Sequence, residues 1–139
     1  MATRIAVITG TARRLGIGRA IARRFVHSGY NVIGIDKIAA EGLDKEESVF
    51  TTHYVHHTCD VSSPADVSMI WAAATTTFPS KNGGDLQLSC LVNNAAIADP
   101  YMPPQSDPQA RLDRWKLVLD VNLTGKIQIY KIMIFPAPA

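Results

Sequence analysis

Residues 5–18, which read I-A-V-I-T-G-T-A-R-R-L-G-I-G, decide the fold of this chain. The first four, Ile5–Ile8, are all apolar, which is typical of a strand buried on both faces of a parallel sheet. Gly10 ends this strand, and a helix is expected to begin close to Gly16. The helical period assigns two faces to it. The buried face would hold Ile17, Ile21, Ala22, Phe25 and Val26, and the solvated face Arg19, Arg23 and His27.

A glycine turn between a buried strand and a helix gathers backbone N–H groups at the positive end of the helix dipole. A pyrophosphate satisfies both, and glycine permits its close approach. The next apolar run, Val32–Ile35, ends at Asp36, 18 residues beyond Gly18. Dinucleotide folds place an acid for the ribose hydroxyls at about 20 residues. The pattern therefore favours dinucleotide binding over a purely structural turn, and over a triphosphatase P-loop, which would need Lys-Ser or Lys-Thr after the last glycine.

Length and composition indicate one globular domain. The chain has 139 residues, 47% of them hydrophobic, and a net charge of +2. Its short basic pairs, Arg13-Arg14 and Arg23-Arg24, are interpreted as solvated or phosphate-facing, so neither a nucleic-acid nor a membrane partner is expected. With no signal peptide or membrane span recognised, a cytoplasmic location is expected.

A third strand-like run covers Thr52–Cys59, is more polar than the first two, and suits a sheet edge. The residues before it, Lys37–Glu47, predict a short or irregular helical crossover. A metal site on the histidines of this run is disfavoured, because strand alternation sends His56 and His57 to opposite faces. Asp60 ends the run at the carboxyl edge of the sheet, where it is either a ligand-binding residue or a turn former.

The middle of the chain predicts a helix and a further strand. Ser63-Pro64-Ala65-Asp66 is a capped helix start, followed by a turn at residues 81–84 and a strand over Leu86–Val92. The helix would bury Val67, Ile70, Trp71, Ala74 and Phe78. Asn93 and Asn94 follow the strand. They are either turn formers or residues whose amides bind both a cofactor and the backbone of neighbouring strands. On this arrangement Cys59 and Cys90 lie on opposite outer strands, out of disulfide reach.

The last helix is expected to start near Ser106-Asp107-Pro108, after a proline-rich loop, and to extend through Ile127–Ile134. Its spacing predicts one buried side, on whose flank Asn122 also lies. That side would hold Leu112, Trp115, Leu119 and Leu123. A core-facing amide must find partners, so Asn122 is either a structural tie or part of a functional network.

Five motifs of this chain occur in the order seen in the short-chain dehydrogenases/reductases, which the chain therefore resembles. The motifs are T-G-x5-G-I-G, Asp36, Cys59-Asp60-Val61, Asn93-Asn94-Ala95-Ala96 and Val121-Asn122-Leu123-Thr124-Gly125. The resemblance covers Arg4 to about Gly125, the first half of a typical member. It implies a partial Rossmann α/β fold, with dinucleotide-binding residues 1–125 and a divergent tail at 126–139. Right-handed crossovers would give a parallel sheet of strand order 3-2-1-4 with helices on both faces.

The resemblance also implies roles for individual residues. The glycine loop would contact the pyrophosphate, Asp36 the adenosine ribose, and Asp60 and Val61 the adenine. Asn122 would match the asparagine that joins the family's proton relay. The loop residues implied are Gly10, Arg14, Gly16, Ile17 and Gly18, and Asn93, Ala95 and Ala96 would line the cofactor. Because Asp36 would repel a 2′-phosphate, NAD is expected, with NADP kept open by Arg13, Arg14 and Lys37.

Three departures from the family pattern matter. Five residues, Thr11–Leu15, separate the first two glycines where the family usually has three, so the loop must bulge. Ala96 stands where glycine is commoner. The family's catalytic Y-x-x-x-K pair is absent from these 139 residues, since the positions four after the tyrosines are Gly34, Thr58, Gln105 and Ile134. The hypothesis is therefore a truncated product that keeps the cofactor half.

Two function classes stay open. One is an NAD(P)-dependent oxidoreductase whose hydride transfer needs another subunit or a longer form. The other is a catalytically silent dinucleotide-binding or interaction protein. In either case Leu86–Val92 would be an open sheet edge, and the last helix would expose part of Trp115, Val118 or residues 127–134. The chain is thus expected to show low stability, self-association or association with a full-length family member.

Overall fold

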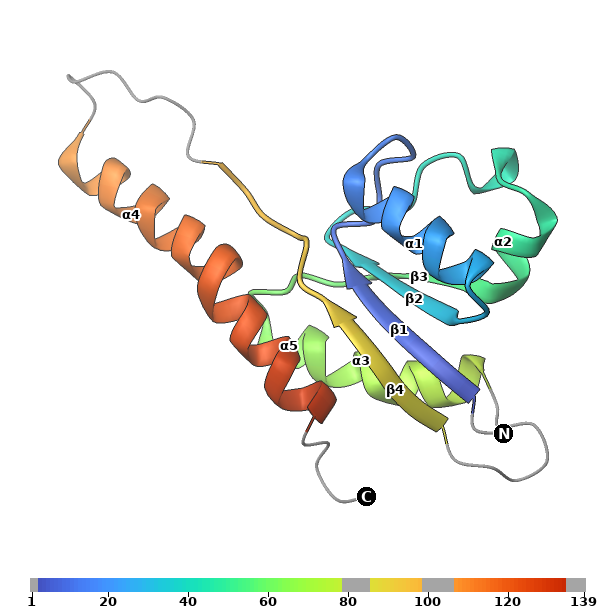
Figure 1. The fold of residues 1–139 in the computed structure, drawn as a ribbon. Coiled ribbons are helices and arrows are strands. Elements are labelled where there is room, and N and C mark those ends of the chain that lie inside the picture. Colours follow the sequence, from blue (N-terminus) through green and yellow to red (C-terminus); the bar gives the residue numbers. More distant parts are fainter. Residues whose placement is uncertain (1–2, 79–85, 99–106, 135–139) are drawn as a thin grey trace.

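A computed structural model describes residues 3–78, 86–98 and 107–134 of the chain (Figure 1). The strands are β1 (Thr3–Thr9), β2 (Asn31–Asp36), β3 (Tyr54–Thr58) and β4 (Leu86–Val92). The helices are α1 (Ile17–His27), η1 (Leu43–Lys45), α2 (Ser48–His53), α3 (Pro64–Thr77), α4 (Pro108–Leu119), the π-helical turn η3 (Asp120–Thr124) and α5 (Gly125–Ile134).

The four strands form one parallel sheet in the order β3-β2-β1-β4, which confirms the predicted topology. β1 lies between β2 and β4, with Val7 beside Ile33 and Ile8 beside Val92. All strands therefore end at the same edge. The expectation that β3 and β4 would be outer strands is also confirmed, and Cys59 and Cys90, beside and within them, are free thiols.

Helices cover both faces of the sheet, as predicted (Figure 1). Strand alternation sends Ile5 and Val7 to one face, where they pack with Val67 and Ile70 of α3 and Ile129 of α5. The opposite face packs against α1 and α2, in a cluster of Ala6, Ile8, Ala22, Val26, Val32, Phe50 and Tyr54. Continuous apolar strands thus receive a helix layer on each side.

The segment before β3 differs from the prediction. The strand begins at Tyr54 rather than Thr52, because Thr52 and His53 end the helix α2, which the sequence pattern does not predict. Phe50 of α2 is 1% exposed and stacks on Tyr54 with ring centroids 4.5 Å apart. Burying this pair fixes a helical turn where propensity alone indicated a strand.

The face assignment of α1 was wrong at its first turn. Arg19, predicted to be solvated, is fully buried, whereas Ile17, predicted to be buried, is 74% exposed. The first turn of α1 packs under the glycine loop rather than on the apolar sheet. There Arg19 finds loop carbonyls and a carboxylate as partners, which removes the usual cost of burying a charge.

The buried side predicted for α4 was also wrong. Its residues Leu112, Trp115 and Leu119 are 46%, 57% and 39% exposed, and Leu123 in η3 is 55% exposed. The described part of the chain offers α4 no apolar surface that could cover this side, and in Figure 1 the helix extends beyond the sheet. The predicted exposure of Trp115 is confirmed, as is the continuation of the helix through α5.

Some predictions fall outside the described residues. These are the turn at residues 81–84, most of the proline-rich loop, and the side chains of Trp71 and Ala74.

No helix in the described ranges is long and apolar enough to cross a membrane. Those ranges also contain no group of three or more metal-ligating side chains.

Candidate cofactor site at the carboxyl edge of the sheet

The glycine turn closes tightly over the end of β1. Gly10 has a φ of +75°, which favours glycine, and its N–H donates to the carbonyl of Ile35 over 2.7 Å. A Cβ added at Gly18 would lie 2.2 Å from the Gly10 oxygen. Helix α1 can therefore approach the strand end only because both positions lack a side chain, which brings its N-terminus to the sheet edge.

Asp36 at the end of β2 holds the other wall of the turn. Its Oδ2 accepts from the N–H of Ala12 over 3.0 Å, so the carboxylate is tied to the loop that follows β1. Because Asp36 is only half-buried, its carboxylate retains accepting capacity towards solvent. The structure thus places a carboxylate beside the glycine turn, where sequence spacing predicted one.

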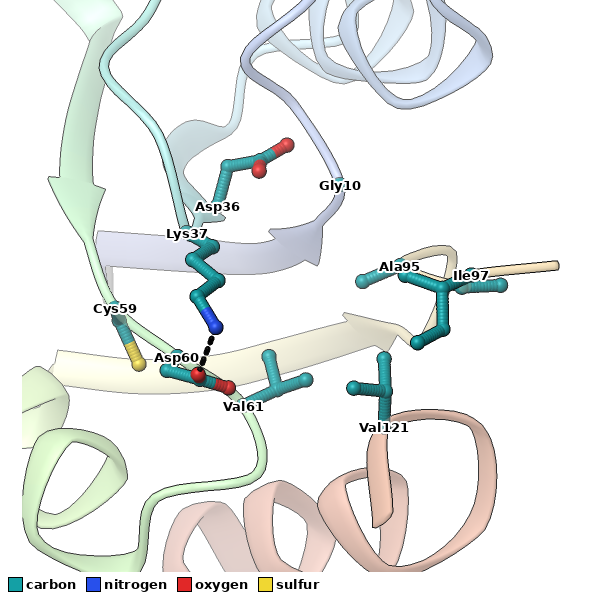
Figure 2. Close-up of a pocket in the computed structure, with 10 residues that line it drawn as sticks. Gly10, Asp36, Lys37, Cys59, Asp60, Val61, Ala95, Ile97 and Val121 are labelled. Atoms are coloured by element: carbon teal, nitrogen blue, oxygen red, sulfur yellow. Dashed lines mark ion pairs between the residues drawn. The ribbon is translucent and has the colours of Figure 1, made fainter. Parts of the chain in front are cut away.

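Asp60 follows β3 and has a strongly shifted pKa. Its carboxylate lies 2.7 Å from Nζ of Lys37 (Figure 2). It also accepts from the Ser62 hydroxyl over 2.6 Å. These hydrogen bonds lower the pKa of Asp60 from 3.8 to about 2. The same contact raises the pKa of Lys37. Asp60 is therefore ionised at neutral pH and already partnered by a cation.

The asparagines after β4 tie this strand to the glycine turn. Asn94 Nδ2 donates to the carbonyls of Thr9 and Gly10 over 3.0 and 3.2 Å, and the N–H of Ala95 donates to Thr9 Oγ1 over 2.8 Å. Asn93 is half-buried, and its Oδ1 has no hydrogen-bond partner among the described residues. Asn94 is thus a structural tie, while Asn93 keeps an unused acceptor.

These strand ends surround one cavity of about 120 Å³ (Figure 2). It is smaller than the roughly 300–1,000 Å³ of a whole ligand pocket, so it matches only one part of a dinucleotide. Six predicted site residues line it: Gly10, Asp36, Asp60, Val61, Ala95 and Ala96. Four further lining residues are not predicted by the sequence, and each is adjacent to a predicted site residue: Lys37, Cys59, Ile97 and Val121.

The remaining predicted residues are not among those that line this cavity. Gly16 caps α1, Ile17 starts it at the surface, and Arg14 is half-buried in the loop beside Gly42. Asn122 in η3 forms a reciprocal pair of hydrogen bonds with the backbone of Ile97. Its Oδ1 accepts from the Ile97 N–H over 2.9 Å, and its Nδ2 donates to the Ile97 carbonyl over 2.8 Å. Asn122 therefore joins the last helix to the cavity wall.

Burial dominates the acid–base behaviour of two further groups near the site. It raises the pKa of the Cys59 thiol to about 12, an effect to which Asp66 and Asp60 add, so this thiol remains protonated. Burial also lowers the pKa of His56, whose Nε2 lies 2.9 Å from the Ile38 carbonyl. Because that oxygen only accepts, His56 carries a proton on Nε2 and is neutral at pH 7.

A glycine turn, an acid after the second strand and a cavity at the carboxyl ends of parallel strands define the dinucleotide-binding class of α/β proteins. Comparison with known proteins narrows this class. The family model for the short chain dehydrogenases matches residues 4–135. This chain belongs to the short-chain dehydrogenase family.

Known relatives are similar to this chain over part of their length. The chain is 30% identical over 133 residues to L-fucose dehydrogenase of Bos taurus, covering 96% of this chain and 44% of that protein. It is 35% identical over 123 residues to 3-alpha-(or 20-beta)-hydroxysteroid dehydrogenase of Mycobacterium tuberculosis, covering 88% and 42%. The chain thus spans less than half the length of these relatives.

Solved structures are similar to this fold. The glucose/ribitol dehydrogenase-type short-chain dehydrogenase of Brucella melitensis matches with a TM-score of 0.69 and 28% identity, over 96% of this chain and 52% of that one. The 3-ketoacyl-(acyl-carrier-protein) reductase of Brucella melitensis, solved in complex with NADH, matches with a TM-score of 0.72 and 25% identity, over 96% and 50%.

Proposed function

We propose that this chain binds a nicotinamide dinucleotide at the carboxyl edge of its sheet. The observation that carries the proposal is the convergence of Gly10, Asp36, Asp60 and Val61, from three separate strand ends, on one cavity beside the N-terminus of α1. The helix end and the glycine turn suit the pyrophosphate, and the carboxylate of Asp36 suits ribose hydroxyls. The NADH complex of the similar ketoacyl reductase supports the same class of ligand.

Within this proposal each predicted residue has a role. Gly10, Gly16 and Gly18, with Arg14 and Ile17 of the same loop, would hold the pyrophosphate. Asp60 and Val61 would bind the adenine. Asn93, Ala95 and Ala96 would line the site, with the unpartnered Oδ1 of Asn93 as one acceptor. Asn122 would correspond to a relay residue, held at the cavity wall by Ile97.

The chemistry proposed is hydride transfer between the nicotinamide and an alcohol or carbonyl compound, as in the family. The bound nicotinamide would supply or accept the hydride. The proton at the substrate oxygen would need a tyrosine with a neighbouring lysine, and these 139 residues contain no Y-x-x-x-K. We therefore propose that the chain alone binds the cofactor silently and that turnover requires residues outside it.

A fluorescence titration with NADH tests cofactor binding. We expect saturable binding by the purified chain and a loss of about 100-fold or more in Gly18→Ala, because a Cβ there meets the Gly10 carbonyl oxygen. The matched control is Ala20→Ser, which adds one heavy atom at an exposed position of the same helix. A folded wild-type chain that shows no saturable binding would contradict the proposal.

We propose NAD rather than NADP as the preferred cofactor, because the carboxylate of Asp36 would repel a 2′-phosphate. Asp36→Ala should weaken NADH binding and tighten NADPH binding, each by about 10-fold. The control Asp44→Ala removes an exposed carboxylate in η1. An unchanged ratio of the two affinities in Asp36→Ala would remove this assignment.

We also propose that the chain associates, with itself or with a full-length family member, through its exposed apolar side. Trp115, Leu119, Leu123 and Ile127 are 39–57% exposed along α4, η3 and α5, and β4 is an open edge among the described strands. Sedimentation at increasing concentration should show association that Leu123→Glu removes. A wild-type chain that stays monomeric at high concentration would count against this partner assignment.

A further inference from the structure

A buried ionic cluster of Arg19, Arg23 and Glu46 lies against the glycine loop and plays no part in the site described above. The side chains of Arg19 and Glu46 are 0% and 5% exposed. Glu46 Oε1 lies 3.2 Å from Arg19 Nη1, and its Oε2 accepts from Arg23 Nε over 2.8 Å. Hydrogen bonding to Arg23 lowers the pKa of Glu46, so the carboxylate is ionised at neutral pH. One acid of the β2–α2 crossover thus joins two arginines of α1.

Both arginines donate to the carbonyl groups of the glycine loop. Arg19 Nε donates to the Thr11 carbonyl over 3.0 Å, and its Nη2 donates to the Ala12 carbonyl over 3.3 Å. Arg23 Nη2 donates to the Arg14 carbonyl over 2.9 Å. Three carbonyl oxygens in the loop that replaces the family's shorter one are therefore turned towards this cluster.

The orientation of these carbonyls decides what the other side of the loop presents. In a planar trans peptide the C=O points opposite to the N–H of the next residue. Carbonyls held by Arg19 and Arg23 therefore turn the N–H groups of Ala12, Arg13 and Leu15 away from the cluster. The Ala12 N–H is used in this way by Asp36 at the carboxyl edge, so the N–H groups of Arg13 and Leu15 are the ones this orientation offers to an anion. A loop that presents N–H groups and hides its carbonyl oxygens favours an anion.

The cluster depends on Glu46 for its charge balance. A buried guanidinium without a counter-charge is strongly unfavourable, whereas its rigid fork of donors suits several carbonyls at once. Glu46 supplies the counter-charge to Arg19, which has no exposed surface. The carbonyl of Ala12 also accepts from the Glu41 N–H over 2.9 Å, so the crossover contacts the loop at a second point.

We infer that Glu46 is a positioning residue for pyrophosphate binding, acting through Arg19 and Arg23 on the shape of the glycine loop. The inference rests on the proposed dinucleotide function. It explains how a loop two residues longer than the family's usual three can still present its N–H groups. Glu46 itself touches neither the cavity nor the site of the cofactor.

The test compares Glu46→Gln with Glu47→Gln. Both variants remove one carboxylate charge from adjacent positions, but the Glu47 side chain is 74% exposed. NADH titrations should show about 10-fold weaker binding for Glu46→Gln, the loss expected from about 1.4 kcal/mol, and less than a two-fold change for Glu47→Gln. ADP-ribose should lose affinity as NADH does, because it carries the pyrophosphate, whereas adenosine, titrated by NMR, should bind unchanged.

Arg23→Met, with Arg24→Met as its exposed control on the same helix, covers the case in which Glu46→Gln does not fold. It should weaken NADH and ADP-ribose by a similar factor and leave adenosine unaffected. Equal NADH affinities in test and control variants would overturn the inference alone. Equal losses for ADP-ribose and adenosine would indicate general loosening and would also overturn it. A folded wild-type chain that binds no NADH would overturn the proposed function and the inference with it.

Discussion

Helices α1 and α4 have nearly the same length, 11 and 12 residues, yet they are used in opposite ways. Helix α1 buries Gly18, Arg19, Ala22 and Val26 against the sheet and the glycine loop, whereas α4 buries no residue. Both show apolar residues at helical spacing. Helical spacing therefore defines an apolar face, but that face is buried only where another element packs against it.

The same contrast extends to the elements around each helix. The sheet under α1 is packed on both faces, and the glycine loop above it is held by buried ionic and backbone contacts. The α4–α5 side is joined to the sheet edge by Ile129 and by the pair between Asn122 and Ile97. The first region should therefore be the stable part of the chain and the second the weakly held part.

Removing core volume under α1 should have the largest effect on stability. Ile8 is fully buried in the cluster with Ala22 and Val26, so Ile8→Ala should lower the free energy of unfolding by about 2–5 kcal/mol. Leu112→Ala on α4, where the leucine is 46% exposed, should cost less than about 1 kcal/mol. Urea unfolding measures both, and equal losses would break the contrast between the two helices.

Cutting the tie between η3 and the sheet edge should have an intermediate effect. Asn122→Ala leaves the N–H and carbonyl of Ile97 without their partners, at a cost of about 1–3 kcal/mol. Hydrogen exchange should quicken at Ile97 and in α5, and remain unchanged in α1. Thr124→Ala, at an exposed position of the same turn, is the control. Exchange that quickens throughout the sheet would show that the two regions unfold as one.

Lowering the pH should reduce the stability of the packed region, because Asp60 becomes protonated and loses its ion pair with Lys37. Its pKa is about 2 in the folded chain and 3.8 for the ordinary group, so its stabilising effect is complete above about pH 4 and is lost as pH falls to about 2. We expect on the order of 1 kcal/mol, since Lys37 is largely exposed. Asp60→Asn should flatten the fall in melting temperature between pH 4 and pH 2, and Asp44→Asn should not. Identical acid profiles for the two variants would contradict this.

The smallest expected difference is in the rates at which the two cysteines are alkylated. This prediction involves no change in the stability of the fold. Cys59 is 1% exposed and its pKa is about 12, whereas Cys90 in β4 is half-buried. Iodoacetamide at pH 8 should therefore modify Cys90 before Cys59, because the thiolate is the reactive form. Mass spectrometry of tryptic peptides measures the two rates, with Cys90→Ser as the control. Faster labelling at Cys59 would mean that the core beside α3 opens readily.

Local sequence patterns predicted the structure correctly wherever the feature depends only on residues close together in the chain. The apolar run Ile5–Ile8 predicts a strand buried on both faces, and all four residues are fully buried. Asp36 ends β2 and Asp60 follows β3, as expected from the apolar run before Asp36 and the more polar strand-like run before Asp60. These features follow from period, turn chemistry and crossover handedness, which depend on residues close in sequence.

Long-range pairing was outside the reach of these patterns. Arg19 was assigned to solvent by helical spacing, and nothing near it in sequence shows that Glu46, 27 positions away, removes the cost of burying it. The sequence indicates Lys37 only as a cation that could favour NADP, whereas in the structure it pairs with Asp60 at the cavity. The helix α2 was missed because Phe50 is held by its stacking on Tyr54 rather than by local propensity.

Sequence patterns alone were sufficient to predict the strand order, the glycine turn, the acids at the strand ends and the family. Each of these features depends on a short segment of the sequence, through its local backbone geometry or the spacing of its apolar residues. The three-dimensional packing was needed to show which arginine is buried, which contacts hold the long glycine loop and which side of α4 remains exposed. Those outcomes depend on residues that are distant in sequence. Such residues either pair with a buried charge, which offsets its desolvation, or cover an apolar face.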